Sequence, residues 1–477
     1  MALRFRNTLS GELETFEPLE RGRVGLYTCG PTVYAPAHVG NFRSFVFADV
    51  LRRYLGWAGY RVTWVMNITD VDDKIIRAAA EQGVATGELT DRYTERFLDD
   101  MRRLRITRPD VLPRATEHIP DMAALTVTLI DRGHAYRTQD GSVFFSIASW
   151  PAYGRLARLD PSMQRVGERV EADEYAKDDV RDFAVWKGPK PGEPSWSTPI
   201  GEGRPGWHIE CSAMSMRYLG ASFDLHTGGV DLIFPHHEDE IAQSEAATGK
   251  PFVTTWLHCA HLRMGGEKMA KRTGNFARPE DVYERGYPPR VLRYALLAAH
   301  YRAPLEFSDA SLTTAASAVE RLSTCLAALD TYREDRGDDA TLPDLLASAR
   351  MGFVEAMDDD LNVAPALAAT FDLVRELNRR MSERAISTAD AARAAEQLRD
   401  VDRVLAIAEE DRDAASSGGT AGGDQIEALL AERAAARAAK DWSRSDALRA
   451  RLAELGIIVE DTADGQRSRR VTEVARG

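Results

Sequence analysis

The feature that most constrains the fold is a strand–turn–helix–strand pattern near the N-terminus. The segment RVGLYT (23–28) is typical of a buried strand, and the turn CGPTVY follows it. Apolar residues then recur with helical spacing over 42–55, and a second strand pattern, RVTWVMNI, occupies 61–68. Two strands joined by a helix form a right-handed crossover, which makes the strands parallel. The sequence therefore predicts an α/β fold with a parallel nucleotide-binding sheet.

The turn before this helix contains the segment PAHVGN (36–41). Helix N-termini in parallel α/β folds bind phosphate through free N–H groups and the helix dipole. His38 would then lie over an anion, and Gly40 would allow an adenine ring to approach the backbone. The pattern is weak by itself, because most His-x-Gly segments are ordinary turns and helix starts.

Residues 206–244 hold the densest set of candidate metal ligands. On a helix expected to open at Phe234-Pro235, His236 and Glu240 are four positions apart and point the same way. His237 and Glu240, three positions apart, form a workable pair as well. Together with Cys211, either pair offers sulfur, nitrogen and oxygen donors of the types that zinc accepts, and a fourth ligand has to come from elsewhere. The alternative is a buried cluster whose members are satisfied by hydrogen bonds.

Two further charged segments flank these patterns. The loop RMGGEKMAKRTGN (263–275) follows a predicted strand at 254–262 and carries Lys268 and Lys271, two point charges suited to a polyphosphate. Its alternative is a solvated basic loop. The segment DVDDK (70–74) is predicted to cap a helix, with Mg²⁺ binding as the alternative.

The rest of the chain separates into regions that differ in residue composition and hydrophobic periodicity. Residues 75–135 are expected to be helical, 142–150 to form a strand, and 151–205 to be irregular, so 115–205 is predicted to be an insertion between two halves of the nucleotide-binding fold. Alanine-, leucine- and arginine-rich helices are predicted at 310–330, 343–357, 363–384 and 388–409, followed by a flexible linker at 411–424, a helical pair at 425–456 and a short end.

The composition limits the cellular compartment and the kinds of binding partner that can be expected. At 477 residues the chain is too long for one core. Its four scattered cysteines do not form a disulfide framework, and no apolar run reaches the roughly 18 residues of a membrane span, so a cytoplasmic protein is expected. The net charge of −13 argues against nonspecific coating of nucleic acid but allows local basic patches.

The order of these motifs resembles the class I aminoacyl-tRNA synthetases, with HVGN in the place of HIGH and KMAKR in the place of KMSKS. The segments CGPTVY, NITDVDDK, DFAVWK, GWHIECSAM, GGVDLIFPHHEDEIAQSE and KMAKRTGNF are similar to the cysteinyl-tRNA synthetase family in particular. The similarity covers essentially the whole chain apart from the linker. Asn41 stands where HIGH has its second histidine, and Ala270 and Arg272 stand where KMSKS has serines.

The resemblance implies roles for individual residues. It adds Cys29 as the fourth zinc ligand beside Cys211, His236 and Glu240, and it selects His236 over His237. His38, Lys268 and Lys271 are implied as catalytic residues, which with Gly40 and Asn41 bind ATP. The implied contacts to cysteine and its adenylate are Cys29, Gly30, Thr32, Asn67, Thr69, Trp207, His226, Gly229 and Asp231, and those to tRNA are Arg437, Trp442 and Asp446. For Trp442 the alternative is packing between the last two helices.

The implied fold is a Rossmann-type parallel-sheet catalytic domain with an insertion, followed by an all-α helical bundle and a small C-terminal domain. The predicted regions are 1–114 and 206–262 for the two Rossmann halves, 115–205 for the insertion, 263–310 for the KMSKS-like and stem-contact region, 311–410 for the bundle, 411–424 for the linker and 425–477 for anticodon recognition.

The implied function is activation of L-cysteine with ATP and transfer of cysteine to tRNA(Cys) by a monomer that carries one Zn²⁺ and uses Mg²⁺ with ATP. A ligase that couples cysteine to an amino sugar and a non-catalytic cysteine- or zinc-binding regulator are the alternatives. The first has no need of an anticodon module. The second should have lost His38 or the two lysines.

Overall fold

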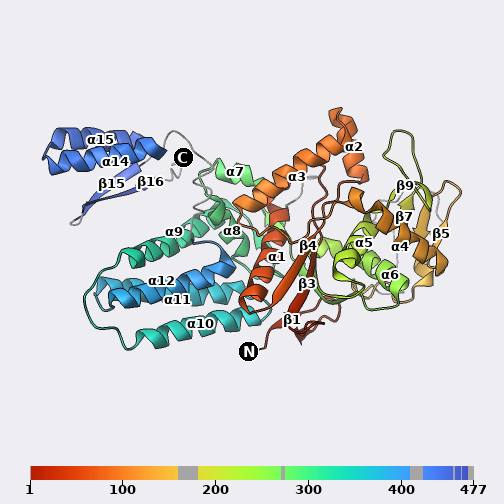
Figure 1. Cartoon of the computed structure of the whole chain (residues 1–477), viewed down its shortest axis with the longest axis horizontal. Coiled ribbons are helices and arrows are strands. Elements are labelled where there is room, and N and C mark those ends of the chain that lie inside the picture. The colour runs from red at the N-terminus through yellow and green to blue at the C-terminus, as the bar shows by residue number, and fades with distance from the viewer. Residues whose placement is uncertain are drawn as a thin grey trace.

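The computed structural model describes residues 2–159, 181–269, 274–408, 423–454, 457–462 and 465–470. Its parallel sheet has four strands in the order β11-β10-β3-β4. These strands are β3 (Arg23–Thr28), β4 (Arg61–Met66), β10 (Phe223–Gly229) and β11 (Val253–Cys259), and helix α1 (Val39–Trp57) connects the first two. Strands β3 and β4 of this sheet lie near the middle of the view in Figure 1. Neighbouring strands pair in parallel, with Leu26 opposite both Trp64 and Leu225. The predicted crossover unit is confirmed.

The segment between the two halves of the sheet has more regular structure than predicted. It contains α2 (Asp73–Gln82), α3 (Thr86–Arg103), α4 (Ile119–Asp131) and a five-stranded antiparallel sheet in the order β5-β6-β7-β9-β8. Its strands are β5 (Ala135–Arg137), β6 (Val143–Phe145), β7 (Phe183–Lys187), β8 (Trp196–Thr198) and β9 (Gly201–Pro205). The prediction of an irregular stretch is therefore wrong over 183–205. Strands of three to five residues are too short to show periodicity in sequence.

One other local prediction needs correction. The helical prediction over 75–135 is wrong at 104–114, where the chain runs beside β4 with Val111 opposite Val65 and Arg114 opposite Ile68. The helix expected to open at Phe234-Pro235 is confirmed: Phe234 is extended with φ −139° and ψ 132°, and a short helical segment up to His237 leads directly into the α-helix that begins at Glu238. That helix, α6 (Glu238–Thr248), faces α5 (Trp207–Leu219), and both stand beside the parallel sheet.

The remaining strands and short helices surround this core. They are β1 (Arg4–Arg6), β2 (Leu13–Thr15), β12 (Leu262–Met264), β13 (Glu267–Lys268), β14 (Leu305–Glu306), α7 (Pro279–Tyr283) and α8 (Pro289–Leu297). Strand β12 pairs with β13 and β14 and carries the chain from the sheet into the lysine-containing loop, of which 270–273 lie outside the described residues.

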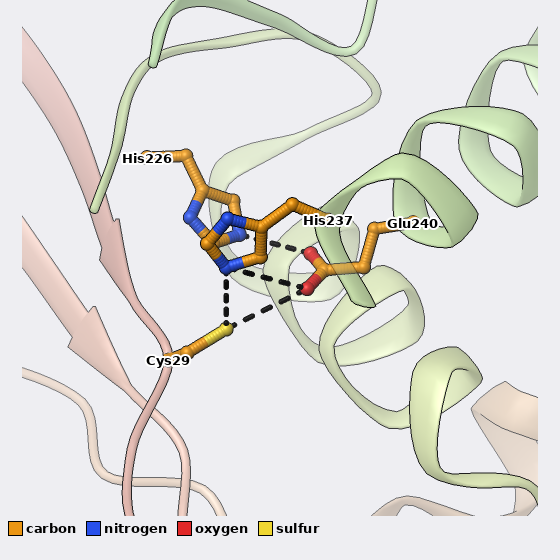
Figure 2. A group of neighbouring side chains, drawn as sticks. All are labelled: Cys29, His226, His237 and Glu240. Atoms are coloured by element: carbon orange, nitrogen blue, oxygen red, sulfur yellow. Dashed lines mark hydrogen bonds and ion pairs between the residues drawn. The ribbon is translucent and has the colours of Figure 1, made fainter. Parts of the chain in front are cut away.

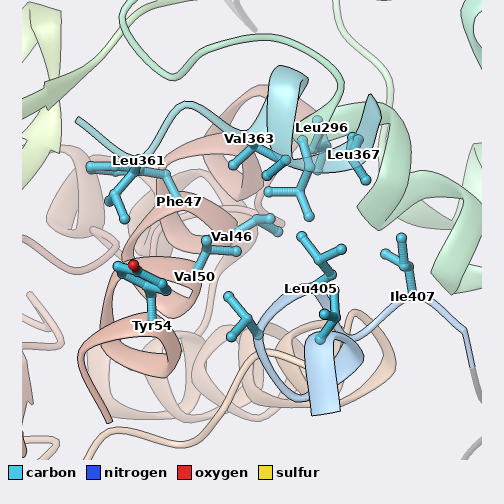
Figure 3. Packing of buried hydrophobic residues seen from close by; sticks show 14 of the residues in the cluster. Val46, Phe47, Val50, Tyr54, Leu296, Leu361, Val363, Leu367, Leu405 and Ile407 are labelled. Atoms are coloured by element: carbon cyan, nitrogen blue, oxygen red, sulfur yellow. The ribbon is translucent and has the colours of Figure 1, made fainter. Parts of the chain in front are cut away.

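A helical bundle continues the core of the parallel sheet. The predicted bundle helices are confirmed as α9 (Asp309–Thr331), α10 (Leu342–Asp358), α11 (Val363–Ser382) and α12 (Thr388–Leu405). Val46, Phe47 and Val50 of helix α1 face the bundle. Leu361 and Leu405 belong to the same buried cluster and lie near them (Figure 3). Because these residues belong to one buried cluster, the bundle and the parallel-sheet region share a core.

A buried arginine fixes this junction. Arg293 of α8 donates to Asp49 Oδ2 of α1 at 2.6 Å, to the Leu405 carbonyl at the end of α12 at 2.7 Å, and to the Leu104 carbonyl at 3.0 Å. Asp49 also accepts from Arg53 at 2.8 Å. Burial opposes ionisation of Asp49, but Arg293 and Arg53 outweigh it and lower the pKa of this carboxyl.

The C-terminal part is helical and then extended. The predicted helical pair is confirmed as α14 (Gly423–Ala438) and α15 (Trp442–Glu454). The short end contains an antiparallel hairpin that sequence did not predict, formed by β15 (Ile457–Thr462) and β16 (Gly465–Arg470). The predicted linker lies outside the described residues up to 422. None of the helices in the described ranges has the length and hydropathy needed to cross a bilayer.

Candidate active site and metal centre

Four predicted metal ligands meet at the carboxyl end of β3. Cys29 follows β3 directly, Cys211 lies on α5, His236 lies just before α6, and Glu240 is in the first turn of α6. Cys29 Sγ is 3.6 Å from Cys211 Sγ and 3.5 Å from Glu240 Oε1, and His236 Nε2 is 3.0 Å from the same oxygen. All four side chains are buried. Their donor atoms lie within 4.8 Å of one another, close enough to hold a metal ion.

A second set of donors overlaps the first. The donor atoms of Cys29, His226, His237 and Glu240 also lie within 4.8 Å of one another. Figure 2 shows these four side chains pointing toward one another. His237 Nε2 is 3.3 Å from Cys29 Sγ, and His226 Nε2 is 2.9 Å from Glu240 Oε2. Because both sets use Cys29 and Glu240, the cluster could hold only one ion at a time. The structure therefore leaves the choice between His236 and His237 open, as the spacing does.

The electrostatics of the cluster suit a cation. Burial opposes ionisation of Glu240, but His226 and His236 outweigh it and lower its pKa to about 2. Burial also disfavours the Cys211 thiolate, yet the hydrogen bond from Cys29 and the charge of His236 lower the pKa of Cys211 to about 6. Burial would lower the pKa of His236, but Glu240 and Cys211 raise it to about 10. Glu240 and Cys211 thus place negative charge on both sides of His236, and the sulfur, nitrogen and oxygen donors of the three side chains fit a zinc ion.

Histidines behind the ligands form a relay of hydrogen bonds. His237 Nδ1 is 2.7 Å from His258 Nε2, and His258 Nδ1 is 2.8 Å from Thr8 Oγ1. Burial lowers the pKa of His237, and it lowers that of His258 to about 3, so both rings are neutral. In this state the two rings form one continuous chain of hydrogen bonds from Thr8 to Cys29. Partners of this kind orient metal ligands.

The residues implied to contact cysteine lie beside the first ligand set. The Gly30 N–H donates to Asn67 Oδ1 at 2.8 Å, and Asn67 Nδ2 donates to Thr69 Oγ1 at 3.1 Å. Thr32 pairs with Thr69 through a backbone bridge. A Cβ on Gly30 would collide with the Asn67 carbonyl, so only glycine fits there. The Trp207 ring stacks on His236 with centroids 4.2 Å apart.

His226, also implied to contact substrate, lies deeper. Its ring is fully buried and stacks on Trp256 with centroids 4.4 Å apart, behind Glu240. This position favours a role in holding the carboxylate.

The HIGH-like and KMSKS-like segments lie against each other. His38 caps α1, accepting through Nδ1 from the Asn41 N–H at 3.2 Å, while the His38 N–H donates to Asn41 Oδ1 at 3.0 Å. Asn41 therefore has a definite role, because it completes this reciprocal cap. A Cβ on Gly40 would lie 2.9 Å from the His38 ring and 3.5 Å from Met269, which follows Lys268.

Lys268 is half-exposed, and its Nζ lies 3.2 Å from Asp231 Oδ2, just beyond Gly229 at the end of β10. Lys271, Ala270 and Arg272 lie outside the described residues.

The residues implied to contact tRNA lie on the C-terminal helices. Trp442 is the first residue of α15, and 56% of its surface is exposed. The guanidinium of Arg437 lies 5.6 Å from its ring centre, and Asp446 is exposed one turn along α15. Trp442 therefore contacts α14 through Arg437 while more than half of its surface stays exposed.

Sequence reasoning missed Glu210 and His258 as members of the site, whereas it named His237 as an alternative ligand. Glu210 is fully buried and accepts from Thr69 Oγ1 at 2.8 Å, and burial raises the pKa of its carboxyl. Its position next to Cys211 in GWHIEC was the available signal. A single acidic residue on a helix is most often solvated, so the letters alone gave no reason to select it.

Comparisons with known proteins agree with this geometry. Three family profiles match in succession: the tRNA synthetases class I (C) catalytic domain at 15–317, the DALR domain at 352–409 and the cysteinyl-tRNA ligase anticodon binding domain at 421–469. Among solved structures, Mycobacterium tuberculosis methionyl-tRNA synthetase in complex with methionyl-adenylate has a TM-score of 0.56 at 18% identity, covering 81% of this chain and 90% of that one. The agnB2 LeuRS of Agrobacterium radiobacter K84 has a TM-score of 0.59 at 12% identity, covering 82% and 84%.

The fold and the site are those of a class I aminoacyl-tRNA synthetase. The cysteine–tRNA ligase of Koribacter versatilis is 46% identical over 98% of this chain and 100% of its own length, and that of Halorhodospira halophila is 47% identical over 98% and 99%. The chain belongs to the cysteine–tRNA ligase family, and it is an aminoacyl-tRNA ligase. A ligase for an amino sugar has no need of the anticodon binding domain matched here.

Proposed function

We propose that Cys29, Cys211, His236 and Glu240 hold one zinc ion and that this centre gives the enzyme its selectivity for cysteine. The observation that carries the proposal is the pair of buried thiols 3.6 Å apart, with His236 and Glu240 beside them. Zinc bound there would supply a Lewis acid to which a thiolate can coordinate. A serine hydroxyl does not ionise near neutral pH, so it would be a far poorer ligand.

Two contacts favour this ligand set over Cys29, His226, His237 and Glu240. The ring of His236 stacks on Trp207, and Cys211 Sγ lies 3.7 Å from Asn67 Oδ1, so the first set borders the predicted cysteine pocket. His226 and His237 instead contact Trp256 and His258 in the interior. The first set also offers two thiolates, which zinc prefers in protein sites. We therefore assign His226 and His237 to holding Glu240 and Cys29.

The chain activates cysteine with ATP and transfers it to the 3′-terminal adenosine of tRNA(Cys). During activation a carboxylate oxygen of cysteine bonds to the α-phosphorus of ATP, and the bond from that phosphorus to the pyrophosphate oxygen breaks. Lys268, Lys271 and His38 would meet the negative charge that develops on these phosphates. Gly40 of the HVGN segment lies close to Met269 of the KMAKR segment. This proximity of the two segments supports the arrangement. Mg²⁺ would arrive with ATP.

The C-terminal helices are proposed to read the anticodon through Trp442, Arg437 and Asp446. Replacing Trp442 by alanine should raise the KM for tRNA roughly tenfold or more, because stacking on an unpaired base contributes about 1–3 kcal/mol. ATP–pyrophosphate exchange should not change, since the cysteine and ATP residues lie before 310. The melting temperature should also stay close to that of the parent protein, because the ring is 56% exposed. Aminoacylation kinetics with purified tRNA(Cys) measure the effect.

A matched control for this substitution is Leu19→Ala. Leu19 lies near the opposite end of the sequence and is 58% exposed, so the Leu19→Ala substitution also removes exposed apolar surface. A Trp442→Ala protein with unchanged melting temperature and unchanged KM for tRNA contradicts the recognition role.

The proposed function is tested by supplying labelled cysteine together with total tRNA or with an amino-sugar acceptor. Labelled tRNA with no labelled amino sugar is the expected result. The reverse pattern would overturn the assignment of the acceptor. Monomeric state and cytoplasmic location stay predictions from the sequence.

A further inference from the structure

A buried carboxyl next to the proposed zinc site has no role in the chemistry described so far. Glu210 lies on α5 between Trp207 and Cys211 in the same helical turn, and none of its surface is exposed. Its Oε2 accepts from Thr69 Oγ1 at 2.8 Å. Its Oε1 has no hydrogen-bond partner among the residues that the structure describes. Burying a carboxyl in this way is costly, so a functional reason for its position is expected.

The hydrogen bonds around Thr69 have only one consistent direction. The backbone N–H of Gly30 can only donate, so the atom of Asn67 that faces it at 2.8 Å is the amide oxygen. The amide nitrogen of Asn67 then faces Thr69 Oγ1 at 3.1 Å and donates to it. The hydroxyl proton of Thr69 is directed to Glu210. A hydroxyl has one proton and two lone pairs, so one lone pair of Thr69 is left to accept from a ligand.

We propose that Glu210 is a positioning residue that holds the Thr69 hydroxyl as an acceptor for the α-ammonium group of cysteine. The inference rests on the proposed function in one respect, namely that Thr69 borders the bound amino acid. An ammonium group has three donors and no acceptor, so it requires an acceptor oriented toward it. Without Glu210 the Thr69 proton would be free to turn toward the ligand and would oppose the ammonium group.

The test compares cysteine with 3-mercaptopropionate, which has the same thiol and carboxylate but no ammonium group. Binding of both to the zinc-loaded protein is measured by calorimetry, together with zinc content. Glu210→Met should weaken cysteine binding about tenfold or more, because a hydrogen bond to a charged group is lost. The affinity for 3-mercaptopropionate and the zinc content should each stay within about twofold of the values for the parent protein. An effect of this size is expected from a minor change in a neutral contact.

Variants of Thr69 and a conservative variant of Glu210 distinguish a role of Glu210 in positioning the Thr69 hydroxyl from a role in stabilising the fold. Thr69→Val should reproduce the loss for cysteine, and adding Glu210→Met to it should cause little further loss, since Glu210 acts through Thr69. Glu210→Gln retains an acceptor oxygen and should recover most of the cysteine affinity. In exchange assays the loss should fall on the KM for cysteine rather than on kcat or the KM for ATP.

Equal losses for cysteine and 3-mercaptopropionate, or additive effects of the two substitutions, would overturn the proposal. If Glu210→Met does not fold, Thr69→Val alone decides, because it must weaken cysteine binding while sparing 3-mercaptopropionate. Failure of the proposed zinc function gives a different result: the parent protein itself would not bind 3-mercaptopropionate.

Discussion

Replacing Cys211 by alanine is expected to remove the bound metal and to lower kcat/KM for cysteine activation by more than 100-fold. Loss of a residue that only supports a ligand typically costs about 10- to 100-fold, and loss of a ligand itself should exceed this. The remaining donors would be one thiol, one imidazole and one carboxylate, which is an incomplete set for a tetrahedral site. Elemental analysis of the purified variant and ATP–pyrophosphate exchange measure the two effects.

Cys211 is the informative position because the two overlapping ligand sets share Cys29 and Glu240 but not Cys211. His237→Gln is the complementary variant, and it should keep stoichiometric zinc with about 10- to 100-fold weaker affinity. Cys259→Ala serves as the control, since Cys259 is buried at the end of β11 and belongs to neither set. Retention of zinc in Cys211→Ala together with its loss in His237→Gln would move the metal to the second set.

Replacing Lys268 by alanine should lower kcat of ATP–pyrophosphate exchange by about 10²- to 10³-fold, the range seen when one donor to a developing oxyanion is removed. The KM for cysteine should change little, because the lysine would act on the phosphates. The ion pair of Lys268 with Asp231, at 3.2 Å, is about half-exposed and therefore weak, so a polyphosphate can displace it. Lys271→Ala should behave in the same way, on the strength of its place in the KMAKR segment.

The control for the lysine variants is Lys250→Ala, which removes an exposed lysine from the loop between α6 and β11. It should leave exchange unchanged. A normal kcat in Lys268→Ala would contradict the catalytic assignment, and a rise in the KM for cysteine without a fall in kcat would place the lysine at the amino acid instead.

The sequence by itself determined the elements whose signal is local. The four bundle helices are long enough for an apolar face to recur several times, and their predicted bounds match α9 to α12 closely. Strands β3 and β4 are apolar runs bounded by turns and were also found. The spacing of His236 and Glu240 within one helical turn brought two ligands together before any fold was known. The resemblance then supplied Cys29, which no local pattern connects to Cys211, 182 positions away.

Only the tertiary structure decided the features that depend on distant pairing. Strand β10 contains three buried polar residues, Asp224, His226 and Thr227, so the hydropathy of its sequence does not indicate a buried strand. These polar groups are tolerated because Thr28, Glu240 and backbone amides bond to them. Apart from β6, which lies within the strand predicted at 142–150, the short strands of the insertion and the C-terminal hairpin were not predicted from the sequence, since each is held by a partner strand and not by its own periodicity.

The roles of Glu210 and of the histidine relay belong to the same category. A carboxyl in a helix and a histidine in a strand have no fixed environment in sequence, and their meaning changes with what lies across from them. Glu210 became significant because α5 brings it against Thr69, and His258 because β11 brings it against His237. Helical spacing acts over a few residues and is visible in the sequence, whereas these two hydrogen bonds join residues 141 and 21 positions apart and exist only after the chain has folded.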